Sequence, residues 1–259
     1  MTTRLMVSPP IGTEAMMRQW ERFVEILTCA GDVEVVRSEP KLASPNLTFT
    51  ASAGVVCGKL AVLSTLDRSE PNAGRCHRVT LVEKGFATIS LSQTSFAGAR
   101  DALFDRGRPI LYVGYGARTD REAAAQLAET LGVTTIPLLL VDPRFTHLDM
   151  ALCPLPGGHV MAHLDAFSQY GQRVLRRTIG PDYLIEVSLE DAMMLACNAV
   201  ELGDTIVVHN LSPRLRARLI DAGYRLYSTD LDEFVAAGGS AKSLTLKLED
   251  GPVFTEAAA

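Results

Sequence analysis

Hydrophobic positions in this chain switch repeatedly between the spacings that mark helices and those that mark strands. Residues 14–30 carry apolar side chains at helical intervals and are predicted to form a helix. Helices are also predicted over residues 120–131, 165–179, 189–195, 213–222 and 231–236. Short apolar runs such as VEVVRSE, TTIPLLLVD and SLTLKLED predict strands. The polar stretch 69–78, which contains Pro71, Asn72 and Gly74, predicts a loop.

The same group of elements recurs along the chain, in the order hairpin, helix, short strand. The repeats are spaced by roughly 40 to 50 residues, a range typical of repeat proteins and propellers. Five such units fit the sequence, and small residues begin each hairpin, in TASAG, AGARD, HLDMA, CNAV and GGSAKS. A doubly wound parallel sheet is disfavoured, because no βαβ unit carries a glycine-rich phosphate loop. We therefore expect a single domain over residues 1–259.

Composition narrows the class of protein. The chain has 259 residues, of which 47% are hydrophobic and 21% charged, so it can bury a sizeable core. Its net charge of −5 argues against nucleic-acid binding. We expect neither a signal peptide nor a membrane helix, which needs about 18 apolar residues in a row. The five cysteines include no CxxC pair, which predicts reduced thiols and a cytoplasmic location.

Several longer segments resemble one enzyme family. They are FTASAG, FAGARDALFD, YVGYGARTD, VDPRFTHLDMALCPLPGG, LACNAV and EFVAAGGSAKSLTL. These segments are similar to the amidinotransferase/dimethylarginine dimethylaminohydrolase family, which belongs to the pentein superfamily with arginine deiminases and arginine dihydrolases. The resemblance implies an α/β fold, a five-bladed α/β propeller with pseudo-fivefold symmetry, and this agrees with the number of repeats. It also implies covalent chemistry, in which a cysteine attacks a guanidinium carbon, a histidine transfers protons and carboxylates hold the guanidinium nitrogens.

The resemblance transfers several site residues to this chain. The family histidine is His147, and the carboxylate two residues further on is Asp149. On a strand these two side chains point to the same face, so both can line one cavity. Asp101, Arg118 and Asn198 also match family positions, and the resemblance implies that they bind substrate.

Other family positions have changed. The nucleophile position, in the pattern AGG-x-AKC-LTL, holds Ser243. The family's Phe-Glu-Gly has become residues 96–98, Phe-Ala-Gly, so the usual carboxylate partner of the histidine is missing. Ser52 stands at a substrate-binding position where the family has asparagine or an acidic residue, and Arg100 replaces the glycine before Asp101. The pocket has lost negative charge, so we expect weaker guanidinium binding and a preference for a carboxylate or a neutral amide.

No metal or other cofactor is expected. His159, His163 and His209 have no ligand-like spacing with a cysteine or carboxylate cluster. Cys153 and Cys197 lie among apolar residues in predicted strands, which is typical of buried, unreactive thiols.

Three functions remain open. The first is a diverged enzyme acting on a small amino-acid-derived substrate, with His147 as the acid–base group and Asp149 as the anchor. In a variant of this hypothesis, Asp149 orients His147, and Ser243 is the nucleophile of a Ser-His-Asp set. The second function is an inactive pentein with a binding or scaffold role. The third is a Cys-to-Ser variant of an ordinary arginine-derivative hydrolase. In each case we expect a small-molecule partner and no nucleic acid or membrane; a homodimer is an option that the sequence leaves open.

Overall fold

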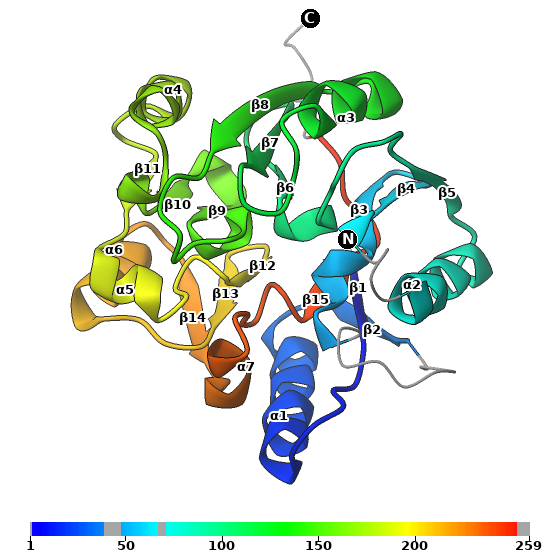
Figure 1. Ribbon diagram of the computed structural model, residues 1–259. Coiled ribbons are helices and arrows are strands. Elements are labelled where there is room, and N and C mark those ends of the chain that lie inside the picture. The colour runs from blue at the N-terminus through cyan, green and yellow to red at the C-terminus, as the bar shows by residue number, and fades with distance from the viewer. Residues whose placement is uncertain (1, 39–47, 67–70, 253–259) are drawn as a thin grey trace, which may run out of the picture.

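Five three-stranded sheets form a ring with helices around its outside (Figure 1). The structure, a computed structural model, describes residues 2–38, 48–66 and 71–252, with side chains described from residue 76 onward in the last range. In the order in which the strands pair, the sheets are β15 (Thr245–Lys247), β1 (Thr3–Val7) and β2 (Val33–Arg37); β3 (Gly54–Cys57), β4 (Leu60–Leu63) and β5 (Ala87–Ser90); β6 (Ala102–Phe104), β7 (Ile110–Tyr115) and β8 (Thr134–Leu139); β9 (Leu152–Pro154), β10 (Val160–Ala162) and β11 (Leu184–Glu186); and β12 (Val200–Leu202), β13 (Thr205–Val208) and β14 (Arg225–Ser228).

Each sheet combines one antiparallel and one parallel pairing. For example, β3 runs antiparallel to β4, with Val55 opposite Val62, and β4 runs parallel to β5, with Val62 opposite Ile89. Parallel neighbours need a long crossover, which here is a helix. These crossover helices are α1 (Glu14–Ala30), α2 (Pro71–Glu83), α3 (Ala123–Leu131), α4 (Gln169–Ile179) and α6 (Pro213–Asp221). The repeating unit of hairpin, helix and strand is therefore confirmed.

Two further helices are short. They are α5 (Leu189–Met193), before β12, and α7 (Asp232–Ala236), before β15. No helix in the described ranges has the length and apolar character to cross a membrane.

The helix α2 replaces a predicted loop. Residues 71–78 are helical, so the loop expected over 69–78 is wrong for its described part. Proline fits the first helical position, because its missing N–H has no partner there in any helix. The side chains of Cys76, Thr80 and Leu81 are buried at helical spacing, and this burial outweighs the polar composition of the segment.

The helix α4 begins later than expected, at Gln169 rather than at residue 165. Ser168 caps it, because its side chain accepts a hydrogen bond from the N–H of Gly171. The helix α3 likewise begins at Ala123, after a turn over residues 120–122.

The first strand joins the two ends of the chain. The pattern analysis missed β1, which pairs in parallel with β2 and antiparallel with β15. Leu5 lies opposite both Val35 and Lys247. The ring is therefore closed by hydrogen bonds between the N-terminal and C-terminal strands.

An ionic cluster around the buried Glu201 ties three of the sheets together. Glu201 of β12 accepts hydrogen bonds from Arg106 Nε at 2.7 Å and from Lys247 Nζ of β15 at 2.6 Å. Arg106, in the turn between β6 and β7, also pairs with Asp250. Burial alone would raise the pKa of Glu201, but Lys247 and Arg106 outweigh it and lower that pKa to about 2.

Candidate active site

The turns that lead into the first strand of each unit carry the candidate site residues. Ser52 lies on a short 3₁₀ turn before β3, Asp101 directly before β6, Asp149 on a 3₁₀ turn before β9, Asn198 before β12, and Ser243 before β15. The repeated small residues explain why these turns can approach closely. A Cβ on Gly98, which has φ +68°, would lie 2.8 Å from the carbonyl oxygen of Ala51 on the neighbouring turn.

The buried histidine of the site pairs with Asp101. His147 Nδ1 lies 3.2 Å from Asp101 Oδ1, which also accepts the N–H of Leu148 at 2.8 Å. The other carboxylate oxygen accepts a hydrogen bond from Thr119 Oγ1 at 2.6 Å, and Thr119 in turn accepts the N–H of Ala97 at 3.1 Å. The expectation that His147 lacks an orienting carboxylate is therefore wrong. Asp101, to which the resemblance assigned substrate binding, supplies that carboxylate instead.

Ser243 belongs to a second group of buried residues, with Asp149 and Asn198. All three side chains are completely buried. Ser243 Oγ donates to Asp149 Oδ2 at 3.0 Å and accepts from Asn198 Nδ2 at 2.9 Å. Asn198 Nδ2 also donates to the carbonyl oxygen of Asp149, and its Oδ1 accepts the N–H groups of Ser240 and Ser243, both at 3.0 Å. The amide of Asn198 thus fastens the turn before β15 to the turn before β9.

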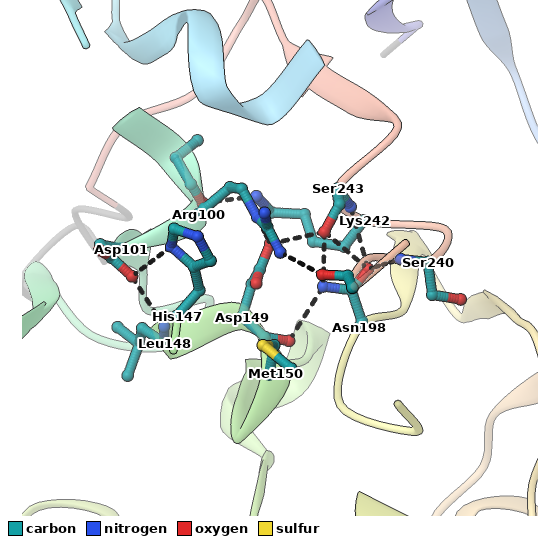
Figure 2. A network of polar contacts seen from close by, with 12 residues as sticks. Arg100, Asp101, His147, Leu148, Asp149, Met150, Asn198, Ser240, Lys242 and Ser243 are labelled. Carbon is teal, nitrogen blue, oxygen red and sulfur yellow. Dashed lines mark hydrogen bonds and ion pairs between the residues drawn. The ribbon is translucent and has the colours of Figure 1, made fainter. Parts of the chain in front are cut away.

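Arg100 reaches between the two groups. In Figure 2 its guanidinium lies between His147 on one side and Ser243 and Asn198 on the other. Arg100 Nε is 3.6 Å from Asp149 Oδ2, the same oxygen that receives the proton of Ser243. The sequence identified Arg100 as an added cation in the pocket, and the structure shows that this cation pairs with Asp149.

The geometry excludes a Ser-His-Asp set in this conformation. His147 contacts Asp101, whereas Ser243 contacts Asp149, and no hydrogen bond or ion pair among the described residues joins His147 to Ser243. A serine needs a base within hydrogen-bond reach to become a nucleophile. The nearest acceptor of the Ser243 proton is instead a carboxylate that is already paired with Arg100.

Lys242 is a half-buried cation that the sequence motifs did not single out. Its ammonium group donates to the carbonyl oxygen of Ala99 at 2.6 Å. Burial lowers the pKa of Lys242, while Asp149 and Glu201 act in the opposite direction. Its place directly before Ser243 in the AGGSAKS run was the available signal.

Two of the predicted substrate-binding residues lie outside these groups. Arg118 is exposed on the loop after β7 and forms no hydrogen bond or ion pair within the described ranges. Ser52 is half-buried, and its N–H donates to the carbonyl oxygen of Phe49 at 2.8 Å. Their roles in substrate binding stay predictions.

The cysteines offer no replacement nucleophile beside His147. Cys153 and Cys197 are buried, and the structure places no disulfide on any of the five free cysteines. Burial and the charge of Glu201 raise the pKa of Cys153 to about 12, and burial raises that of Cys197 as well. A thiol with such a pKa is almost entirely protonated at neutral pH.

A group of potential metal ligands was missed by spacing. His209, Asp230 and Asp232 place their ligand atoms within 4.8 Å of one another. His209 Nδ1 lies 3.0 Å from the N–H nitrogen of Leu231 and 3.3 Å from the carbonyl oxygen of Thr229, and its Nε2 faces Asp232 Oδ1 at 3.3 Å. Both ring nitrogens of His209 therefore already have contacts within the chain.

A hollow of about 980 Å³ lies between α4, α5 and α6. Several of its charged groups already have partners within the chain. Glu186 pairs with Arg176, and the Asp191 carboxylate accepts hydrogen bonds from Ser188 and Ser212. None of the predicted site residues lines this hollow, so the chemistry is better placed at the turns before β6, β9 and β15, where buried charges lack complete pairing.

Comparisons with known proteins agree with the sequence motifs. Residues 7–249 match the family model described as N,N dimethylarginine dimethylhydrolase, eukaryotic. A bifunctional arginine dihydrolase/ornithine cyclodeaminase of Synechocystis is 36% identical over 92% of this chain and 34% of its own length. The N(G),N(G)-dimethylarginine dimethylaminohydrolase of Mycobacterium tuberculosis is 31% identical over 93% of this chain and 78% of its own length. The chain thus spans about a third of the bifunctional cyanobacterial relatives that it matches.

A solved structure gives the same answer for the fold. The N-terminal domain of the cyanobacterial arginine dihydrolase ArgZ, as a cysteine-to-serine mutant bound to its substrate, has a TM-score of 0.91 and 33% identity over 96% of this chain and 98% of that one. The predicted five-bladed α/β propeller is therefore confirmed. Sequence, family model and fold together show that this chain belongs to the dimethylarginine dimethylaminohydrolase family of the pentein superfamily.

Proposed function

We propose that this chain is a diverged pentein enzyme that acts on a small amino-acid-derived substrate, with His147 as its acid–base group and without a thiolate nucleophile. One observation carries the proposal. The pair of His147 and Asp101 remains buried and aligned even though Ala97 has removed the family's usual partner carboxylate. Its relatives are named for reactions of arginine and dimethylarginine, which supports a substrate derived from an amino acid.

The hydrogen bonds of Asp101 assign a state to His147. Asp101 Oδ1 accepts the Nδ1 proton, so Nε2 is the basic nitrogen that can take a proton from a substrate and return it. Thr119 and the N–H of Leu148 fix Asp101 in turn. A carboxylate held in this way keeps the imidazole in one orientation and stabilises its protonated form during the reaction.

The replaced nucleophile changes the reaction class. In the family, a thiolate attacks the guanidinium carbon and forms a covalent intermediate. Ser243 instead donates its hydrogen bond to Asp149, and a carboxylate is a much weaker base than an imidazole. The proposed reaction therefore proceeds by proton transfer at His147, with water or the substrate itself as the nucleophile.

Charge defines the proposed substrate class. Asp149 already faces Arg100 and Ser243, so it offers little to an added guanidinium. A carboxylate or a neutral amide on an amino-acid framework suits a pocket with an added arginine. We place this activity in the cytoplasm, where the free cysteines would stay reduced; a homodimer remains an option.

A second candidate is a pentein that binds or scaffolds without turnover. It is favoured by the closed set of hydrogen bonds among Asp149, Asn198 and Ser243, which leaves the serine no base other than a paired carboxylate. A third candidate is an ordinary hydrolase whose nucleophilic cysteine has been changed to serine. A native gene that encodes serine at position 243 would exclude this candidate.

The first two candidates differ in what His147 does. Purified protein is incubated with a panel of arginine derivatives, amino-acid amides and amino-acid carboxylates, and loss of each compound is followed by mass spectrometry. We expect one of the amides or carboxylates to be consumed, by the wild type and by His159→Ala but not by His147→Ala. His159 is the matched control, because it hydrogen-bonds Tyr224 away from the site.

Two results would count against the proposed enzyme. Turnover of arginine or methylated arginine at the rate of the hydrolytic relatives would show that the guanidine chemistry persists. A folded His147→Ala variant that keeps full biological function in the native host would favour the scaffold.

A further inference from the structure

Two buried charges at the site face each other without a hydrogen bond. Arg100 is 6% exposed and Asp149 is completely buried. Their closest atoms, Nε and Oδ2, are 3.6 Å apart, which is an ion pair but too long for a hydrogen bond. Within the described part of the chain, Arg100 Nε and Asp149 Oδ1 are both buried atoms without a hydrogen-bond partner. Incomplete pairing of buried charges is unfavourable, so stability alone does not explain Arg100.

The rest of the guanidinium is held on two sides. Its Nη2 donates to the carbonyl oxygen of Gly238 at 2.7 Å. Its Cζ lies 5.1 Å from the centre of the Phe49 ring, at cation–π distance. Position 239, which follows Gly238, must be glycine for the Phe49 ring to lie beside Arg100, because a Cβ on Gly239 would be 2.4 Å from the ring. A carboxylate, a carbonyl and an aromatic face are contacts with which proteins bind a free guanidinium.

We propose that Arg100 is an internal ligand, whose guanidinium occupies the position beside Asp149 and Ser243 that would otherwise receive the guanidinium of a bound compound. Figure 2 shows this group between His147 and Ser243. The inference rests on the proposed function, in which Asp149 belongs to the site, and it adds the residue that determines which compounds the site rejects.

Arg100 therefore excludes guanidines by occupancy and by charge. A second guanidinium would find only Oδ1 of Asp149 unpaired, because Arg100 and Ser243 share Oδ2, so it could not form the bidentate pair that guanidinium and carboxylate groups favour. It would also meet a like charge among buried groups, where repulsion between cations is strong. Removal of the Arg100 side chain leaves a cavity that is lined by Asp149, the carbonyl oxygen of Gly238 and the face of Phe49.

The test is chemical complementation of Arg100→Ala. Thermal unfolding is measured with methylguanidinium chloride in the low millimolar range, far below denaturing concentrations of guanidinium salts. Methylammonium chloride at the same concentration controls for ionic strength and charge. We expect methylguanidinium to raise the melting temperature of Arg100→Ala in a saturable way and to leave the wild type unchanged. Calorimetry should show at least about tenfold tighter binding of methylguanidinium and L-arginine by the variant.

Matched variants identify the site. Arg100→Ala combined with Asp149→Asn should lose the rise in melting temperature that methylguanidinium causes, because the carboxylate supplies the main attraction. Arg144→Ala should show no such rise. Arg144 also pairs with an aspartate, Asp142, and lies near a phenylalanine ring, but on the surface. Arg100→Met keeps apolar volume in place of the arginine stem and provides a second readout if the alanine variant is poorly folded.

Several results would overturn the inference. They are wild-type binding of L-arginine as tight as that of Arg100→Ala, equal stabilisation by methylammonium, and persistence of the gain without the Asp149 charge. An alanine variant that stays unfolded even with methylguanidinium, beside a folded Arg100→Met that binds guanidines no better than the wild type, also counts against it. These readouts measure binding without turnover, so they are independent of the His147 experiment that tests the proposed function.

Discussion

Substitution of Asn198 by alanine should destabilise the whole protein rather than only weaken ligand binding. Asn198 is completely buried, and both its amide protons and both lone pairs of its oxygen are used within the chain. Alanine would leave the buried N–H groups of Ser240 and Ser243 without an acceptor. A buried group that loses its partner costs about 1 to 3 kcal/mol. Two such groups, with the lost donors to Asp149 and Ser243 added, give a loss of about 4 kcal/mol in the free energy of unfolding.

The loss is measurable by urea unfolding followed by circular dichroism. A change of this size corresponds to a fall of roughly 8 to 16 °C in melting temperature for a domain of this length. Asn210→Ala is the matched control. It removes an exposed asparagine whose Oδ1 accepts only the adjacent N–H of Leu211, so a change below about 0.5 kcal/mol is expected. An Asn198→Ala variant within about 1 kcal/mol of the wild type would refute the reasoning and return Asn198 to a substrate-binding role.

Four further outcomes test the description of the site and the core. Ser243→Cys alone should form no citrulline or ornithine from L-arginine, because the guanidinium position stays filled and the new thiol has no bonded imidazole; product detected by mass spectrometry would contradict this. Asp101→Asn should slow turnover of whichever substrate is found by roughly 100-fold to 10,000-fold, since it removes the group that orients the acid–base histidine, and an unchanged rate would exclude that role. The pKa of Glu201 is lowered to about 2 from 4.5, so its ionised form stabilises the fold above pH 4.5; up to about 3 kcal/mol should be lost as the pH falls from 4.5 towards 2, and the loss should be smaller in Glu201→Gln. At neutral pH iodoacetamide should label the exposed Cys29 and spare Cys153, whose pKa is raised to about 12; rapid labelling of Cys153 in the folded protein would show that it is less buried than described.

The repeat pattern and the family motifs were sufficient to predict the fold. They failed where local composition and tertiary packing disagree. The segment that begins at Pro71 has loop-like composition, but its later apolar residues pack on the core, so it is helical. The strand Thr3–Val7 was missed because its two partners lie far away in the chain, one of them at the opposite end.

The sequence predicted which residues form the candidate site, but it did not predict which of them form hydrogen bonds or ion pairs with each other. His147 and Asp101 are both family positions, yet they stand 46 positions apart in the sequence, which gave no indication that they are bonded. The loss of the glutamate at position 97 suggested an unoriented histidine, and only the geometry shows that another carboxylate serves it. Likewise, the substitution to Arg100 indicated a change of charge, whereas its partners Phe49 and Gly238 depend on how separate turns meet.

The pairing of the first and last strands has a consequence for biosynthesis. Ser243 lies two residues before β15, and β15 pairs with β1, whose residues come more than two hundred positions earlier in this sequence. A chain that still lacks β15 can therefore build the other blades while the site is without Ser243. The capacity to bind a ligand is complete only after β15 has paired with β1. A protease cut after residue 238 would leave most of the polypeptide in place and abolish that capacity.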